Sequence, residues 1–184
     1  MNISTETIKK TPRVYVACLA SYNAGILHGK WVEVTSSEEE LLNEIKNVLN
    51  SSTEEGAEEW AFHDHEYFEP FNVEEYTSTK TLCEYASVLL SLDQYDLEAF
   101  QKFEGDLNGK ADEILENFHE SYMGSHESEE EYAEYLFNEC YEIPEKARYY
   151  IDYKSFWRDL TYNGYYSAES KMSNYRTVHI FLNS

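Results

Sequence analysis

Acidic and aromatic residues are interleaved through the middle of this chain, and the pattern limits the folds open to it. Glu58-Glu59-Trp60-Ala61-Phe62 is one such stretch, and residues 130–137 (EEYAEYLF) are another. Blocks of like charge are typical of disordered tails, whereas here the aromatic side chains can be buried on one face while the carboxylates stay on the other. We therefore expect folded domains with a rigid acidic surface.

The charge is concentrated in the middle of the sequence. The 184 residues hold 36 Asp and Glu against 14 Lys and Arg, a formal net charge of −22. Residues 38–75 carry 13 acids against Lys46 alone, and residues 82–145 carry 18 acids against two lysines, whereas both ends of the chain are slightly positive. Such a surface repels nucleic acid and anionic membranes and attracts basic proteins.

Composition excludes several classes of protein. The apolar fraction of 42% is enough for small cores, so the chain is not a disordered acidic tail. No apolar run approaches the roughly 20 residues of a membrane span, and residues 1–10 lack the apolar stretch of a secretory signal. Cys18, Cys83 and Cys140 are odd in number and far apart, which favours a reduced cytoplasmic protein over a disulfide scaffold.

Hydrophobic periodicity predicts an α+β chain of three small domains behind an extension. Residues 1–12 are polar and aperiodic, so we expect them to form a loose extension. The period changes from strand-like to helical at Thr77, and strand signals return after Asn163. The prediction is an elongated chain with an N-terminal antiparallel sheet plus helix, a central bundle of short helices, and C-terminal helices plus a small antiparallel sheet. The predicted bounds of these domains are 13–76, 77–118 and 119–184.

The first domain should have a ββαβ order. Runs of β-branched and apolar residues predict strands at 14–19, 29–34 and 60–62. Ahead of the helix, Ser36 and Glu39 fit a capping box, and the apolar residues that follow recur at helical spacing.

The central domain is predicted from helical spacing alone. Apolar side chains between Leu82 and Tyr122 recur three and four residues apart, which indicates helices with one face buried. Gly105 and Gly109 break this pattern, so we expect short helices in a small bundle.

The C-terminal domain is predicted from capping and turn residues. A second capping box at Ser128 and Glu131 should begin a helix, and Pro144 is suited to the first position of another helix that runs to residue 151. Asn163-Gly164 is a strong hairpin signal, and residues 178–182 alternate as a final strand.

Candidate catalytic and metal-binding motifs are weak. His63 and His65 would share one face of a strand, but no third ligand is evident, and polar histidines at a strand end are the favoured interpretation. Residues 104–109 resemble the opening of an EF-hand loop, yet Leu115 stands where a bidentate Glu is needed. We find no phosphate-binding loop, nucleophile elbow or Cys/His signature. The prediction is a protein that is not an enzyme, with no catalytic residue, no metal and no cofactor.

Tyrosine is over-represented, at 17 of 184 residues. Most of these side chains suit a core position whose hydroxyl reaches water. The group formed by Tyr149, Tyr150, Tyr153, Phe156 and Trp157 also suits a subunit contact, because aromatic residues are enriched in interfaces. Both interpretations of this group remain open.

The charge density invites a comparison with DNA. B-DNA carries one negative charge per roughly 1.7 Å of axis, so the −27 of residues 38–145 would cover about 46 Å, and a two-fold dimer about 90 Å. A rigid acidic protein of matching shape could gain the attraction that a basic groove exerts on DNA. The alternative is an acidic surface that only keeps the protein soluble.

Several stretches, in order along the chain, resemble the ArdA-type antirestriction proteins. The opening of that family is similar to Val14-Tyr15-Val16-Ala17, Tyr22-Asn23-Ala24-Gly25 and Gly29-Lys30-Trp31. Its acidic strand and the junction after it are similar to Glu58-Glu59-Trp60-Ala61-Phe62-His63-Asp64 and Val73-Glu74-Glu75-Tyr76-Thr77-Ser78. The antirestriction motif of the family is placed here at residues 139–152. That motif and the segment after it resemble Ile143-Pro144-Glu145, Tyr150-Ile151-Asp152-Tyr153 and Arg158-Asp159-Leu160. The chain departs from the family in residues 1–12, in His65 where the family has Tyr, and in a longer acidic stretch at 123–131.

The resemblance implies a DNA mimic encoded on a mobile genetic element and acting in the cytoplasm of a bacterial host. Members of this family are elongated three-domain chains that pair through the C-terminal domain and occupy the DNA-binding groove of type I restriction-modification enzymes. Restriction would be blocked, and whether modification is blocked as well stays open. The alternative is an acidic adaptor that binds another basic, DNA-associated protein.

This function would be carried by carboxylates that stand in for phosphates. On the first domain the expected residues are Glu38, Glu39, Glu40, Glu54, Glu55, Glu58, Glu59, Glu66, Glu74 and Glu75. On the other two domains they are Asp96, Glu113, Glu116, Glu130, Glu131 and Glu134. The effect of such a surface is a summed field, so no single carboxylate should be essential.

A homodimer is also expected, because type I enzymes read two half-sites with a pseudo-two-fold layout. A seam between two negative bodies must be charge-poor or locally basic, and the aromatic stretch within residues 139–160 meets that requirement. The expected motif and contact residues are Ile143, Pro144, Glu145, Ala147, Tyr150, Ile151 and Asp152. The expected partners are thus a type I restriction-modification enzyme and a second copy of the chain, with no nucleic acid and no membrane.

Overall fold

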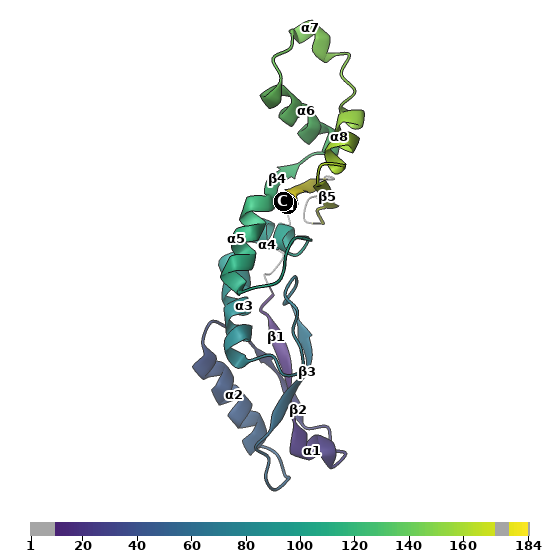
Figure 1. Cartoon of the computed structure of the whole chain (residues 1–184). Coiled ribbons are helices and arrows are strands. Elements are labelled where there is room, and N and C mark those ends of the chain that lie inside the picture. The colour runs from purple at the N-terminus through teal and green to yellow at the C-terminus, as the bar shows by residue number, and fades with distance from the viewer. Residues whose placement is uncertain (1–9, 172–176, 184) are drawn as a thin grey trace, which may run out of the picture. The chain divides into compact units, whose positions relative to one another are not determined.

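The computed structural model describes residues 10–171 and 177–183 (Figure 1). Contacts divide the chain into two compact units, unit 1 (Met1–Gln94) and unit 2 (Tyr95–Ser184). Each unit contains helices and one three-stranded antiparallel sheet, so the predicted α+β class is confirmed. The finer division into three domains of an elongated chain stays a prediction, and most of the predicted N-terminal extension, residues 1–9, lies outside the described residues.

Unit 1 is built on a sheet of order β2-β1-β3. Its strands are β1 (Arg13–Cys18), β2 (Gly29–Glu33) and β3 (Trp60–Glu66), and both neighbours run antiparallel to the central β1. Val14 and Val16 on β1 have no exposed surface. The predicted ββαβ order is confirmed, and β3 continues four residues beyond the predicted end at Phe62.

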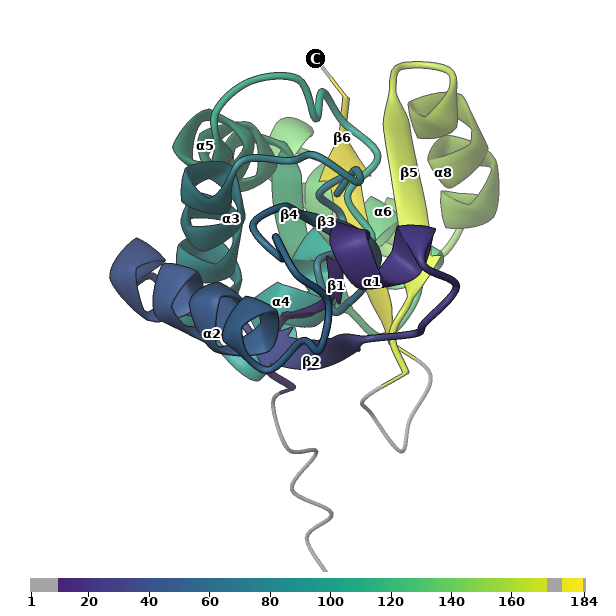
Figure 2. The same ribbon diagram turned by 90° about the horizontal axis from the view of Figure 1, so that it is seen from below.

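The helices of unit 1 are α1 (Leu19–Asn23), α2 (Glu38–Asn50) and α3 (Thr79–Ser91). Helix α2 packs on β1 and β2 through buried apolar residues at helical spacing, and α3 packs against α2 (Figure 2). The predicted cap of α2 is wrong by one residue. The side chain of Ser37, not Ser36, accepts a hydrogen bond from the Glu40 N–H, and Thr35 Oγ1 donates to the Glu40 carboxylate. Helix α1 was not predicted, since Tyr22-Asn23-Ala24-Gly25 indicated only a turn.

Unit 2 has a sheet of order β4-β6-β5. Its strands are β4 (Tyr122–His126), β5 (Tyr165–Glu169) and β6 (Val178–Leu182), all antiparallel to their neighbours. The predicted final strand is confirmed as β6, but it is central, and four consecutive residues of it are buried. The predicted Asn163-Gly164 hairpin is wrong: Gly164, with a φ of 92°, leads into β5, and the chain between β5 and β6 runs through residues 170–177.

The helices of unit 2, together with the one that spans the division, are α4 (Gln94–Phe100), α5 (Ala111–Ser121), α6 (Glu129–Cys140), α7 (Glu145–Arg148) and α8 (Tyr153–Thr161). Ser128 caps α6 by accepting a hydrogen bond from the Glu131 N–H, as predicted. Helix α7 is shorter than the predicted 145–151, and Pro144 lies at its N-cap and not at its first helical position. No described helix has the length and apolar character needed to cross a membrane.

A buried carboxylate fixes the end of β5 and the central strand of unit 2 to α4. Glu98 is 8% exposed and accepts hydrogen bonds from Ser170 Oγ, the Lys171 N–H and His179 Nε2. Since a carboxylate only accepts, His179 Nε2 carries a proton, and the Tyr122 hydroxyl lies 2.9 Å from Nδ1 of the same ring. Burial raises the pKa of Glu98, but these hydrogen bonds outweigh burial and hold the pKa below its ordinary value.

Replacing this carboxylate should destabilise the protein in a pH-dependent way. We expect Glu98→Gln to lower the free energy of unfolding by about 1.5–3 kcal/mol at pH 7, because hydrogen bonds to a buried charge are lost. A depressed pKa means that the stabilisation is present above the ordinary carboxyl pKa and is lost as the pH falls through the lower value of the folded state. Denaturant titrations from pH 7 to pH 3 should therefore show the two proteins converging in acid.

Glu116→Gln is the matched control, because it removes the same charge from an exposed position on α5. Its free energy of unfolding should stay within about 0.5 kcal/mol of that of the parent protein. An effect of Glu98→Gln no larger than that of Glu116→Gln would contradict the structural role of the buried carboxylate.

Candidate functional site

The carboxylates expected to imitate phosphates all lie at the surface. Twelve of the sixteen are exposed, the other four (Glu38, Glu54, Glu66 and Asp96) are half-buried, and none is buried. Transfer of an unpaired carboxylate from water to the protein interior costs free energy, so the carboxylates stay at the surface while the aromatic side chains between them are available for burial. Surface position alone does not assign a role, and the phosphate-like role of these residues remains a prediction.

Two clusters of three glutamates lie in the first turns of helices. The first turn of α2 begins Glu38-Glu39-Glu40 and that of α6 begins Glu129-Glu130-Glu131. Carboxylates at these positions interact favourably with the positive end of the helix dipole. Helix geometry therefore fixes where these charges are presented.

Several of the predicted carboxylates are already engaged within the chain, Glu40 through Thr35 among them. Glu66 Oε2 lies 2.6 Å from Arg13 Nη2, and Glu131 Oε2 lies 2.7 Å from His126 Nδ1. Glu38 accepts from Thr79 Oγ1 at 2.6 Å, and Glu113 accepts from the Lys110 N–H at the start of α5. Glu66 is the least suited to imitate a phosphate, because its charge is balanced by an arginine.

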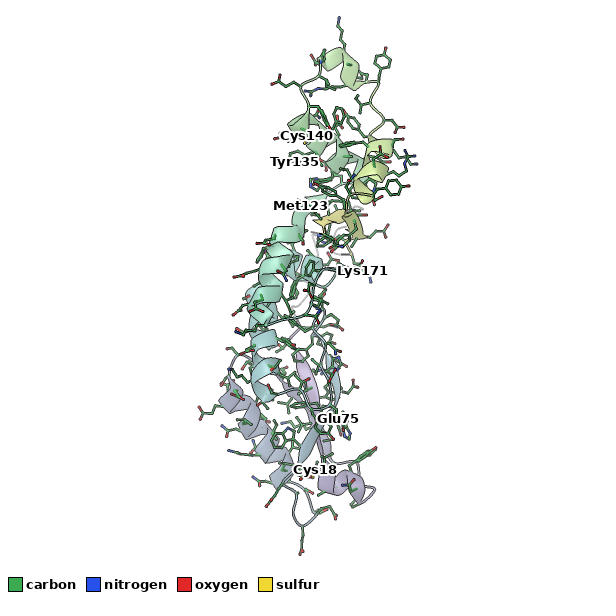
Figure 3. All side chains as sticks on the ribbon, in the orientation of Figure 1. Cys18, Glu75, Met123, Tyr135, Cys140 and Lys171 are labelled. Atoms are coloured by element: carbon green, nitrogen blue, oxygen red, sulfur yellow. The ribbon has the colours of Figure 1, made fainter. Side chains whose placement is uncertain are left out.

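Strand β3 brings together acids that are distant in sequence. Glu58 and Glu59 precede the strand and Glu75 follows it, and the Phe62 N–H donates to the Glu75 carbonyl at 3.0 Å, which holds the returning segment alongside β3 (Figure 3). These three residues line a hollow of about 560 Å³ together with Trp60 and Tyr76. We call it the β3 hollow.

The aromatic side chains of the β3 hollow were missed by sequence reasoning, which named only its acids. Tyr76 is 72% exposed. A hydrogen bond with the Glu75 carboxylate, the negative charge of Glu75 and that of Glu59 raise the pKa of the Tyr76 hydroxyl. The one available signal was the alternation of acids with Trp60 and Phe62, which indicated burial but not a surface hollow.

A neighbouring hollow of about 520 Å³ includes both candidate metal ligands. His63 and His65 line it together with Asp64 and the glutamates after β3. The ring of His63 packs edge-on against Tyr22, and that of His65 packs against Phe68. Within residues 10–171 and 177–183, no group of three His, Cys, Asp or Glu side chains is placed to hold a metal ion.

The predicted motif and contact residues lie on the connection from α6 to α8, with α7 at its far end (Figure 1). No residue of α7 is buried, and Tyr149 and Tyr150 are 87% and 89% exposed. Of the predicted residues, Pro144, Glu145, Tyr150 and Asp152 are exposed, and Ile143, Ala147 and Ile151 are half-buried. Asp152 also has a structural role, because it caps α8 by accepting from Ser155.

Comparison with known protein families gives a match to residues 14–172 by the family described as antirestriction protein (ArdA). The chain belongs to the ArdA family. The match includes β1 from Val14 on, all of β4, the acids around the β3 hollow and the whole of residues 139–152. ArdA proteins are antirestriction proteins, which implies an interaction with restriction-modification enzymes. A search of the curated proteins finds no match.

Proposed function

We propose that this ArdA chain is a non-enzymatic DNA mimic that occupies the DNA-binding groove of a type I restriction-modification enzyme. The observation that supports this most directly is that none of the sixteen expected carboxylates is buried. Those in the first turns of α2 and α6 stand on helices, and Glu58 and Glu59 directly precede β3. A preorganised array loses little entropy on binding, which is what a competitor of DNA requires.

The proposed mechanism is electrostatic competition. A basic groove gains much of its affinity for DNA from neutralising phosphates and releasing counterions. Fixed carboxylates on a protein can meet the same lysines and arginines and steer the encounter. DNA and the inhibitor would then exclude each other from the enzyme, and restriction would stop without any chemical change.

A competition assay tests this proposal. Purified type I enzyme is titrated with the protein at several concentrations of unmodified target DNA, and cleavage is measured. The half-inhibitory concentration should rise in proportion to DNA. Inhibition that excess DNA does not relieve would contradict mimicry and favour the adaptor alternative. Methyl transfer measured on the same samples shows whether modification is blocked too.

Removing charges should weaken inhibition gradually. Any one of Glu39, Glu55 and Glu134 replaced by Gln should change the half-inhibitory concentration less than about threefold, because the field is a sum over many groups. Six or more such changes on one face should weaken inhibition progressively, and more so at high salt, where the remaining charges are screened. If one such change abolished inhibition, the summed-field mechanism would be contradicted and a mechanism that depends on one specific site would be favoured.

We further propose that two copies pair through residues 139–160. The connection around α7 exposes aromatic surface, and residues 144–158 carry four basic side chains against Glu145 and Asp152. Burial of this surface against a second copy would remove exposed apolar area.

Charge placed in this segment should prevent pairing. Ala147→Glu or Tyr150→Glu is expected to give a folded monomer with half the mass of the parent protein in sedimentation, because like charges would meet at the seam. Tyr162→Glu is the control, since Tyr162 is 80% exposed but lies outside the segment. A parent protein that sediments as a monomer at micromolar concentration and low salt would refute the dimer.

A further inference from the structure

We propose that the β3 hollow binds an arginine side chain of a basic partner protein. The inference rests on the proposed function for the existence of such a partner, and it adds a contact that a DNA duplex does not offer. A phosphate track attracts any positive charge, whereas the β3 hollow combines three carboxylates with the aromatic side chains of Trp60 and Tyr76.

The composition of the hollow suits a guanidinium group. Guanidinium is planar and weakly hydrated, so it stacks on aromatic faces while its N–H groups donate to carboxylates at the edge. Leu19 and Phe62 add apolar surface to the walls, and Glu58, Glu59 and Glu75 are exposed. Lysine fits less well, because its ammonium is compact and strongly hydrated and makes no planar stack.

The chain itself holds an arginine between side chains of the same types. The guanidinium carbon of Arg13 lies 4.9 Å from the centre of the Trp31 ring, and Arg13 Nη2 lies 2.6 Å from Glu66 Oε2. One arginine is thus held between an indole and a carboxylate across the sheet. The β3 hollow offers an indole, a phenol and three carboxylates, and among the described residues no lysine or arginine lines it.

The electrostatics of the hollow also favour a cation. Glu58, Glu59 and Glu75 all line the hollow, and like charges in proximity repel each other. The raised pKa of the Tyr76 hydroxyl, caused first by its hydrogen bond with Glu75 and then by the surrounding negative charge, reports the same field. A guanidinium in the hollow would balance charge that is uncompensated within it.

Binding can be measured on the full chain without any restriction enzyme. The three tryptophan side chains, Trp31, Trp60 and Trp157, each give one indole N–H signal in a ¹⁵N spectrum. Titration with N-acetyl-arginine amide should shift the Trp60 signal along a saturable curve and leave the other two nearly unmoved. The uncharged analogue N-acetyl-citrulline amide should have no such effect. Equal shifts of all three signals, equal shifts with citrulline, or lysine amide binding as tightly as arginine amide would each overturn the proposal.

Variants separate the hollow from general charge. Tyr76→Ala and the triple change of Glu58, Glu59 and Glu75 to Gln should both abolish the saturable shift. A control triple of Glu33, Glu39 and Glu55 to Gln removes the same charge from exposed positions outside the hollow and should retain the shift. Loss of the shift in the control as well would show a summed field and refute a site.

Inhibition assays then separate this inference from the proposed function. Tyr76→Ala changes no charge, so a pure charge track predicts no effect, whereas an arginine contact predicts a half-inhibitory concentration about five- to tenfold higher. Tyr76→Phe should retain most of the inhibition, and Tyr162→Ala all of it. If Tyr76→Ala leaves competitive inhibition unchanged, arginine binding by the β3 hollow is refuted while DNA mimicry stands. If the Trp60 signal shifts with arginine amide but the protein does not compete with DNA, mimicry is refuted while arginine binding stands.

Discussion

Burial of aromatic side chains beneath a surface of carboxylates is the interaction on which the rest of the structure depends. With a net charge of −22, repulsion among the acids opposes compaction, and the apolar contacts must offset it. In unit 2, Phe118 lies near Phe100, Phe103, Tyr122 and Phe181, and three of these five side chains have no exposed surface. Aromatic rings provide the large buried area per residue that short helices and small sheets need.

Several basic side chains and hydrogen-bond donors pair with carboxylates at junctions between neighbouring helices and strands. Arg13 joins β1 to the end of β3, Lys30 pairs with Glu44 between β2 and α2, and Thr79 donates to Glu38 between α2 and α3. The Lys30 contact holds the pKa of Glu44 below its ordinary value. Exposed pairs of this kind stabilise little individually, yet each reduces repulsion at a junction between elements. The acidic surface is therefore interrupted where elements meet.

The sequence predicted most of the strands and helices, because their signals are local. β-branched runs identified β1 and β2, alternation identified β6, and Ser128 identified the start of α6. Strand β4 was missed, since Tyr122-Met123-Gly124-Ser125-His126 has no apolar alternation and follows α5 directly. At Asn163-Gly164 the predicted turn is present, but it ends α8, where the Asn163 N–H donates to the Leu160 carbonyl, so no strand precedes it and no hairpin forms. The acids of the site were predictable from composition, whereas the β3 hollow depends on the Phe62–Glu75 backbone contact, which no local pattern encodes.

The clusters of three acids in the first turns of α2 and α6 have a consequence for how the protein responds to salt. Dissolved ions screen the repulsion among these carboxylates, which favours the folded chain, and they would also screen the attraction to a basic groove that we propose for the same carboxylates. Stability and potency then depend on ionic strength with opposite signs. If the chain acts as the proposed DNA mimic, the ionic strength that stabilises this fold most is the one at which it would compete least well with DNA. The range of salt concentration in which it acts would then be bounded by folding at the low end and by binding at the high end.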